Sequence, residues 1–163
     1  MTIRSAAPFL IAAVLLSSME PYPATAREES LVWSETTNGS LVTLSYGPLD
    51  PAKGPVFMLA CLNGMNIAVL NVRMALADAE PGDPLTIELT AGRLTTPVKA
   101  EATHDQASDQ LLGEASDVDV KRVLDVLRLP GPLTVKIGES RETLADRGRE
   151  DAVVRFVDHC QLI

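Results

Sequence analysis

Short apolar runs along the chain predict a domain built mainly from β-strands. Residues 85–91 alternate apolar with polar side chains, as expected of a strand with one buried face. Residues 56–62 and 66–73 are apolar on both faces, which favours central strands covered on both sides. The predicted strands span residues 31–33, 41–46, 56–62, 66–73, 85–91, 94–103 and 133–137, with 110–115 as a further short candidate.

Glycine, proline and asparagine mark the turns between these strands. Asn38-Gly39 and Asn63-Gly64 are typical of hairpin turns, because asparagine and glycine tolerate positive φ. Pro97 favours an edge for the strand 94–103, because proline cannot donate to a neighbouring strand. Two polar segments, 104–109 and 138–147, are expected to be exposed loops.

Two segments have helical periodicity. Val120, Val123, Leu124 and Leu127 share one face, and Ser116-Asp117 precedes them as an expected helix start. The last segment places Ala152, Val153, Phe156, Val157 and Cys160 on one stripe. Together the elements predict one α+β domain, an antiparallel sheet or sandwich of about seven strands with two helices.

The first 26 residues have the pattern of an export signal. Arg4 supplies the positive charge, residues 6–17 are apolar, and Ala24-Thr25-Ala26 forms a small-x-small cleavage site. The apolar run is shorter than the roughly 20 residues of a membrane-spanning helix. We therefore expect cleavage after Ala26, no membrane insertion of the mature chain, and a single domain over residues 27–163 in the periplasm or medium of a bacterium.

Charge and composition narrow the classes of partner. The chain has 163 residues and a formal net charge of −8, which argues against nucleic acid and anionic membrane surfaces as partners. Aromatic residues make up only 4% of the sequence, so the core must be aliphatic and a saccharide cleft lined by stacking rings is disfavoured.

The two cysteines predict a disulfide. Cys61 alternates with Phe57 and Leu59 on an apolar strand, and Cys160 lies on the buried stripe of the last helix. An exported domain with two cysteines usually pairs them, so we expect Cys61–Cys160 to tie the helix to the sheet. The alternative is a thiol nucleophile assisted by His104 or His159, but no motif surrounds either cysteine.

No other residues form a recognisable chemical constellation. His104, Asp105 and Asp109 lack zinc-ligand spacing, and we expect no metal, no cofactor and no enzymatic activity. Four arginines near the C-terminus have two interpretations, a docking patch for an acidic partner or an ordinary solvated surface of mixed charge. These arginines are Arg141, Arg147, Arg149 and Arg155.

The order of elements resembles a known group of proteins. The resemblance depends on four features in order along the chain. They are Trp33 near the mature start, the strand 57–61 that ends in cysteine, the helix 120–129 followed by the strand 133–137, and the closing helix 148–160. This arrangement is similar to small exported bacterial β-rich proteins that include accessory proteins of type VI secretion systems. The resemblance implies a disulfide-closed domain that binds partners and has no known chemistry, although the Arg-rich strands of such proteins are not matched here.

These observations predict a non-enzymatic periplasmic or secreted protein-interaction module with a protein partner of unknown identity. Two other hypotheses remain open. A protruding loop, either 138–147 or 104–109, would suit an inhibitor that plugs the cleft of an exported enzyme. An apolar cavity between sheet and helix would suit a carrier of small ligands.

Overall fold

The computed structural model describes residues 30–161 except 64, 66 and 106–109. The predicted export signal, its cleavage after Ala26 and Asp109 of the polar segment 104–109 lie outside the described residues. In the described part, the chain forms nine β-strands, two α-helices and one short 3-10 helix. The fold is therefore α+β and antiparallel as expected, with more strands than the predicted seven.

The strands follow the predicted runs closely, with one addition. The strands are β1 (Leu31–Asn38), β2 (Leu41–Pro48), β3 (Phe57–Leu62), β4 (Ile67–Val72), β5 (Pro84–Ala91), β6 (Leu94–Asp105), β7 (Gln110–Ala115), β8 (Leu133–Ile137) and β9 (Ser140–Leu144). The helices are α1 (Val120–Leu127) and α2 (Arg149–Cys160), and the 3-10 helix is η1 (Pro51–Lys53).

Strand β9 is the element that the sequence pattern missed. Its residues were expected to be an exposed loop, because Ser140, Arg141, Glu142 and Thr143 are polar. Strand β9 instead pairs with β8 from Ile137–Ser140 to Leu133–Leu144. Only Leu144 is buried, so an edge strand of this kind carries almost no apolar alternation. Residues 138–144 are thus the turn and second strand of a β-hairpin that β8 begins.

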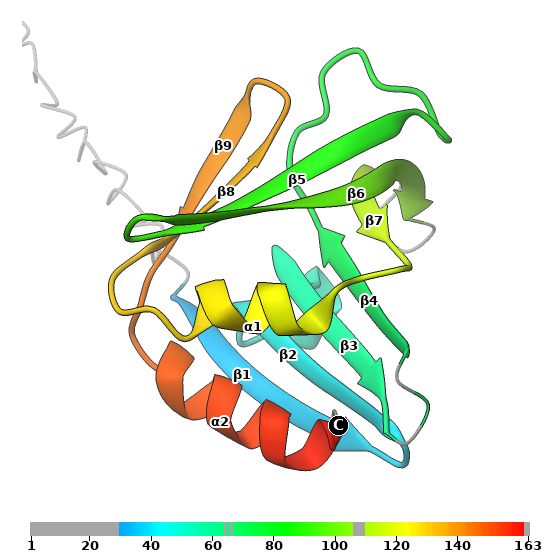
Figure 1. Ribbon diagram of the computed structural model, residues 1–163. Helices are drawn as coiled ribbons and strands as arrows, with labels where there is room; N and C mark the ends of the chain where they lie inside the picture. The colour runs from blue at the N-terminus through cyan, green and yellow to red at the C-terminus, as the bar shows by residue number, and fades with distance from the viewer. Residues whose placement is uncertain (1–29, 64, 66, 106–109, 162–163) are drawn as a thin grey trace, which may run out of the picture.

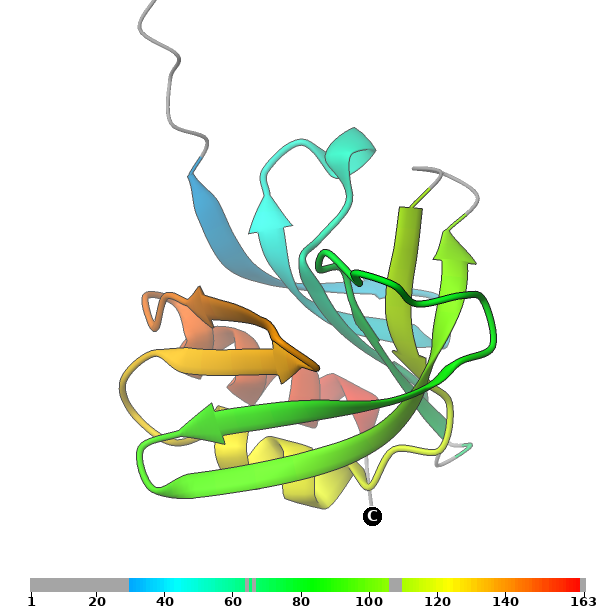
Figure 2. The ribbon, with the colours of Figure 1, turned by 90° about the horizontal axis from the view of Figure 1, so that it is seen from above.

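All nine strands join one antiparallel sheet in the order β1-β2-β3-β4-β7-β6-β5-β8-β9. The junction between β4 and β7 is short, with Leu70–Val72 opposite Gly113–Ala115. The sheet curls so strongly that a Cβ added to Gly113 would lie 2.9 Å from Ile137 Cδ1 on β8. Figures 1 and 2 show the resulting arrangement, with β1–β4 on one side and β5, β6, β8 and β9 on the other.

The two ends of the curled sheet meet through side chains. Trp33 Nε1 on β1 donates a hydrogen bond of 2.6 Å to the carbonyl of Ala145, immediately after β9. The backbone N–H of Ala145 in turn donates to the Tyr46 hydroxyl at 3.3 Å. Trp33 also packs against Tyr46 and Phe57, with ring centroids 5.1 and 5.5 Å away. Three of the four aromatic residues in the described part of the chain therefore gather where the sheet closes.

The helices fill the concave side of the curled sheet. Helix α1 contacts β5 and β6, and α2 contacts β1 and β2, as Figure 1 shows. Helix α1 begins three residues later than Ser116 suggested, with Asp119 as its N-cap accepting a hydrogen bond from the Arg122 N–H. Val123, Leu124 and Leu127 are buried as predicted, within a core that is otherwise mostly aliphatic.

Strand β6 is not an edge of the sheet as a whole, since it lies between β5 and β7. Its pairing with β7 begins only at Glu101, however, so Pro97 has a strand neighbour on the β5 side alone. The missing N–H of proline therefore removes no bond between strands. The physical reason for the prediction holds locally, although the predicted position in the sheet was wrong.

Candidate functional site

The predicted disulfide is confirmed. Cys61 on β3 and Cys160 on α2 are bonded, with their Cα atoms 6.2 Å apart and 99 positions between them in sequence. Both residues are 1% exposed, so the bond lies in the core. These are the only cysteines of the chain, which leaves the thiol-nucleophile hypothesis without a free thiol. A buried long-range disulfide is typical of proteins that work in oxidising compartments.

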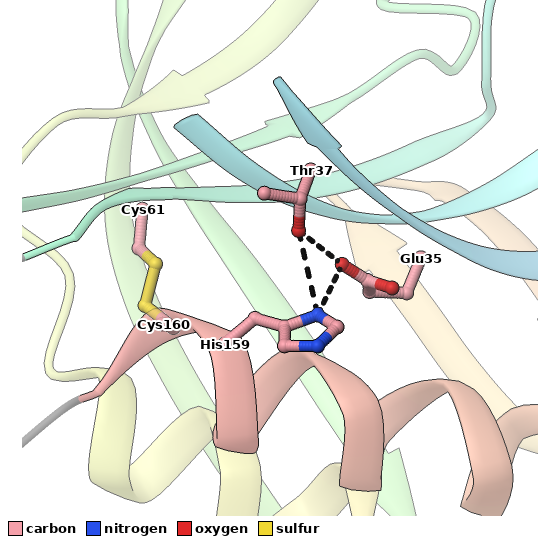
Figure 3. The surroundings of a disulfide bond; sticks show 5 residues. All are labelled: Glu35, Thr37, Cys61, His159 and Cys160. Carbon is pink, nitrogen blue, oxygen red and sulfur yellow. Dashed lines mark hydrogen bonds and ion pairs between the residues drawn. A yellow bond between two sulfur atoms is a disulfide. The ribbon is translucent and has the colours of Figure 1, made fainter. Parts of the chain in front are cut away.

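A polar cluster lies beside the disulfide, at the same end of α2. Figure 3 shows His159 directed toward Glu35 and Thr37 of β1, while Cys160 is directed toward Cys61. His159 Nδ1 lies 3.1 Å from Glu35 Oε1 and 3.4 Å from Thr37 Oγ1, and the Thr37 hydroxyl donates to Glu35 Oε1 at 2.8 Å. The cluster joins two elements whose residues are more than a hundred positions apart.

The Glu35 carboxylate is the buried member of this cluster. Its side chain is 7% exposed, whereas those of His159 and Arg155 are 51% exposed. Burial alone would raise the pKa of Glu35, but the hydrogen bonds from His159 and Thr37 and the nearby charges of His159 and Arg155 lower it below its ordinary value. Glu35 is therefore held ionised inside the helix–sheet interface.

The cluster does not have the geometry of a hydrolytic triad. A triad histidine contacts its carboxylate through one ring nitrogen and its nucleophile through the other. Here Glu35 Oε1 and Thr37 Oγ1 both approach the same nitrogen, Nδ1 of His159. The arrangement can hold α2 on β1, but it cannot pass a proton from the Thr37 hydroxyl through the ring. Glu35 could not be predicted from the sequence, because nothing local to β1 indicates a partner on the last helix.

The structure separates Arg149 from the other three predicted docking arginines. Arg149 is 1% exposed, although both interpretations of these arginines required it at the surface. Its guanidinium donates to the carbonyls of Leu129 and Gly131 and pairs with Asp146 at 2.9 Å. Arg149 Cζ also lies 5.9 Å from the centre of the Trp33 ring. Burial lowers the pKa of Arg149, and Asp146 partly opposes that shift.

The other three arginines lie on the surface in different surroundings. Arg141 is on β9 opposite Lys136, and Arg147 precedes α2. Arg155 lies on α2 with its Nε 4.0 Å from Glu35 Oε2. A docking role remains a prediction for these three residues alone, because the buried Arg149 guanidinium cannot reach a partner's surface.

A more unusual surface lies on the convex side of β1–β4. The outward positions of these strands carry no charged residue, although 22% of the chain is charged. We call them the uncharged outer face, which comprises Val32, Ser34, Thr36, Asn38, Leu41, Thr43, Ser45, Gly47, Met58, Ala60, Leu62, Ile67, Val69 and Asn71. Helix α2 contacts β1 and β2 from the opposite, concave side.

The apolar part of this face is open to solvent. Leu41, Leu62 and Ile67 lie side by side in register at one end, and Leu41 and Ile67 are 42% and 46% exposed. Ala60 and Val69 continue the apolar surface in the next row, both half-buried. The expectation that β3 and β4 are covered on both faces was therefore wrong, since every second residue of each strand is exposed or half-buried.

The other half of the sheet has the composition expected of a solvated surface. Outward positions of β5, β6 and β8 include Glu88, Lys99 and Lys136, and Glu88 pairs with Lys136 at 3.4 Å. A sheet with one solvated face normally alternates apolar inward with polar outward residues. The outward positions of β3 and β4 depart from this pattern, because all of them except Asn71 are apolar. The two-sided apolar character of residues 56–62 and 66–73 was the signal of this in the sequence.

Comparisons with family models, curated proteins and solved structures gave no match for this chain. Among the described helices, none is long and apolar enough to cross a membrane. The described residues also bring no three His, Cys, Asp or Glu side chains together in a metal-binding group.

Proposed function

We propose that this protein is a non-enzymatic interaction module of the periplasm or the secreted fraction, which docks a protein partner on its uncharged outer face. The observation that carries the proposal is the absence of charge over the convex side of β1–β4, with Leu41, Leu62 and Ile67 together at one end. Depletion of charged residues distinguishes the cores of protein interfaces from ordinary surface. The disulfide supports the proposed compartment.

The fold also supports an interaction role by making this surface rigid. Inward residues of β2 and β3 such as Leu44 and Leu59 are fully buried, and the disulfide holds β3 to α2 from beneath the face. A preorganised surface loses little conformational entropy on binding. The resemblance to exported bacterial accessory proteins leads to the same proposal from the order of elements.

Matched charge insertions test the proposal. Val69→Glu places a carboxylate in the middle of β4, on the uncharged outer face, and Thr86→Glu places one at an exposed outward position of β5. Each tagged variant is used to capture proteins from the non-reduced extracytoplasmic fraction of its own source. We expect the dominant partner of the wild type to be lost with Val69→Glu and kept with Thr86→Glu.

Thermal unfolding of both variants separates lost binding from lost folding. If Val69→Glu does not fold, Leu41→Ser provides a milder change at an already exposed position. Retention of the partner by folded face variants would contradict the proposal, and so would the absence of any partner for the oxidised wild type.

A further inference from the structure

The uncharged outer face ends at a pair of like charges. Across the junction with β7, Asn71 lies opposite Glu114, and Glu114 lies opposite Glu101 of β6. The Asn71 amide, oriented with its nitrogen toward Glu114, donates to Glu114 Oε2 at 3.2 Å. The two carboxylates therefore occupy directly opposed outward positions next to the last strand of the uncharged outer face.

No lysine or arginine in the described part of the chain lies within ion-pair distance of this pair. Neither Glu101 nor Glu114 has an ion-pair partner among the described residues. By contrast, Asp105, which lies on β6 with Glu101, pairs with Arg73 at 2.5 Å. Like charges directly opposite each other on a sheet are destabilising, and a cation placed between them would relieve the repulsion. The border of the face is thus complementary to a positive group that comes from outside the chain.

Resting on the interaction function proposed above, we infer that the partner is a protein with an uncharged, apolar contact centre and a lysine or arginine at the margin that meets Glu101 and Glu114. The apolar centre matches Leu41, Leu62 and Ile67, and the cation matches the acidic border. Charge complementarity of this kind sets the orientation of docking and raises the association rate.

The net negative charge of the chain and the Glu101–Glu114 pair disfavour other molecules on this face. A second copy of this chain would bring a further net charge of −8 and the same acidic border. Nucleic acid and anionic lipid surfaces would be repelled for the same reason. A basic-rimmed protein is the occupant that satisfies both the apolar centre and the carboxylate pair.

Photo-crosslinking from the face identifies the occupant directly. Ile67, 46% exposed, is replaced by benzoylphenylalanine in the full chain, which is produced in its own source and irradiated. Mass spectrometry of the adduct then gives the crosslinked segment. We expect one heterologous protein with a lysine or arginine near that segment. An adduct of two copies of this chain would overturn the inference, because a second copy would then be the occupant.

Charge reversal tests the acidic border. The double variant Glu101→Lys, Glu114→Lys is compared with Glu139→Lys, Glu142→Lys, which changes net charge equally at exposed positions in the β8–β9 hairpin. We expect the first variant to bind the purified crosslinked partner about tenfold more weakly, with the control near wild type. Added salt should weaken wild-type binding as well.

The outcomes separate the two proposals. Equal affinities for both double variants, with binding still lost in Val69→Glu, would overturn the basic-rimmed partner and leave the interaction function standing. The absence of any adduct from Ile67, together with no effect of Val69→Glu on capture, would overturn both.

Discussion

At the scale of single residues, the buried Arg149 guanidinium decides how the chain enters its last helix. Its hydrogen bonds to Leu129 and Gly131 fasten the α1–β8 connection to the first residue of α2. Its ion pair with Asp146 links it to the segment after β9, and its position over Trp33 links it to the first strand. One side chain thus connects three stretches of chain, namely the α1–β8 connection, the entry to α2 and the first strand.

Replacing Arg149 should therefore destabilise the protein far more than replacing its neighbour Arg147. Arg149→Ala removes a buried side chain and leaves the half-buried carbonyls of Leu129 and Gly131 without their donors, and we expect a loss of about 3 kcal/mol in the free energy of unfolding. Arg147→Ala, at an exposed position, should change it by less than about 0.5 kcal/mol. Urea denaturation of both variants measures the difference, and equal losses would show that the buried contacts contribute little.

At the scale of elements, Glu35 fastens the edge strand β1 to helix α2. The inward-facing carboxylate meets His159, Thr37 and Arg155 beside the disulfide, so a covalent and an ionic link lie at the same end of the helix (Figure 3). An inward-pointing charge also suits an edge strand, because it discourages pairing with the edge of another molecule.

The lowered pKa of Glu35 makes this link sensitive to acid. The ionised carboxylate stabilises the folded state above the ordinary value of 4.5, and that contribution is lost as pH falls through the lower folded pKa. Glu35→Gln should therefore cost about 1 kcal/mol at neutral pH, and the gap from wild type should narrow in acid. Urea unfolding across this range measures the gap.

The exposed Glu139 in the β8–β9 turn is the matched control for this change. Glu139→Gln should unfold like the wild type at every pH, since that carboxylate has no partner among the described residues. A gap for Glu35→Gln that stays constant into acid would show that the link does not depend on ionisation.

At the scale of the whole molecule, closure of the chain depends on contacts between its two ends. The disulfide spans 99 positions, and Trp33 reaches across to the segment that follows the last strand. Both links hold the concave side together, and this leaves the convex uncharged outer face as a rigid surface. The concave side is therefore held together by long-range links, whereas the convex uncharged outer face is open to solvent.

Removing the disulfide should weaken the whole fold. The double variant Cys61→Ala, Cys160→Ala should lose about 2–4 kcal/mol in the free energy of unfolding, because the unfolded chain regains a long loop. Wild type in reductant should lose a similar amount, and the double variant should not respond to reductant. Denaturation curves with and without dithiothreitol test this, and a double variant as stable as oxidised wild type would refute the closing role.

The sequence by itself determined the elements whose burial repeats with a regular period. The disulfide was predictable because Cys61 lies on a strand with period two and Cys160 on a helical stripe, and both periods report which side faces the core. Strand β9 was not predictable, because an edge strand with only Leu144 buried has no periodic pattern of apolar residues. The hairpin turn after Asn38, with Gly39 at positive φ, followed from local backbone preferences alone.

Only the tertiary structure decided which apolar faces are covered and which charged groups are buried. Residues 56–62 and 66–73 are apolar on both sides. This pattern does not show whether another layer of the same chain or a separate partner covers the second side. Arg149 and Glu35 likewise have buried environments made by residues distant in sequence, such as Gly131 and His159. Local patterns report a residue's own preference, whereas burial depends on what the rest of the chain brings to it.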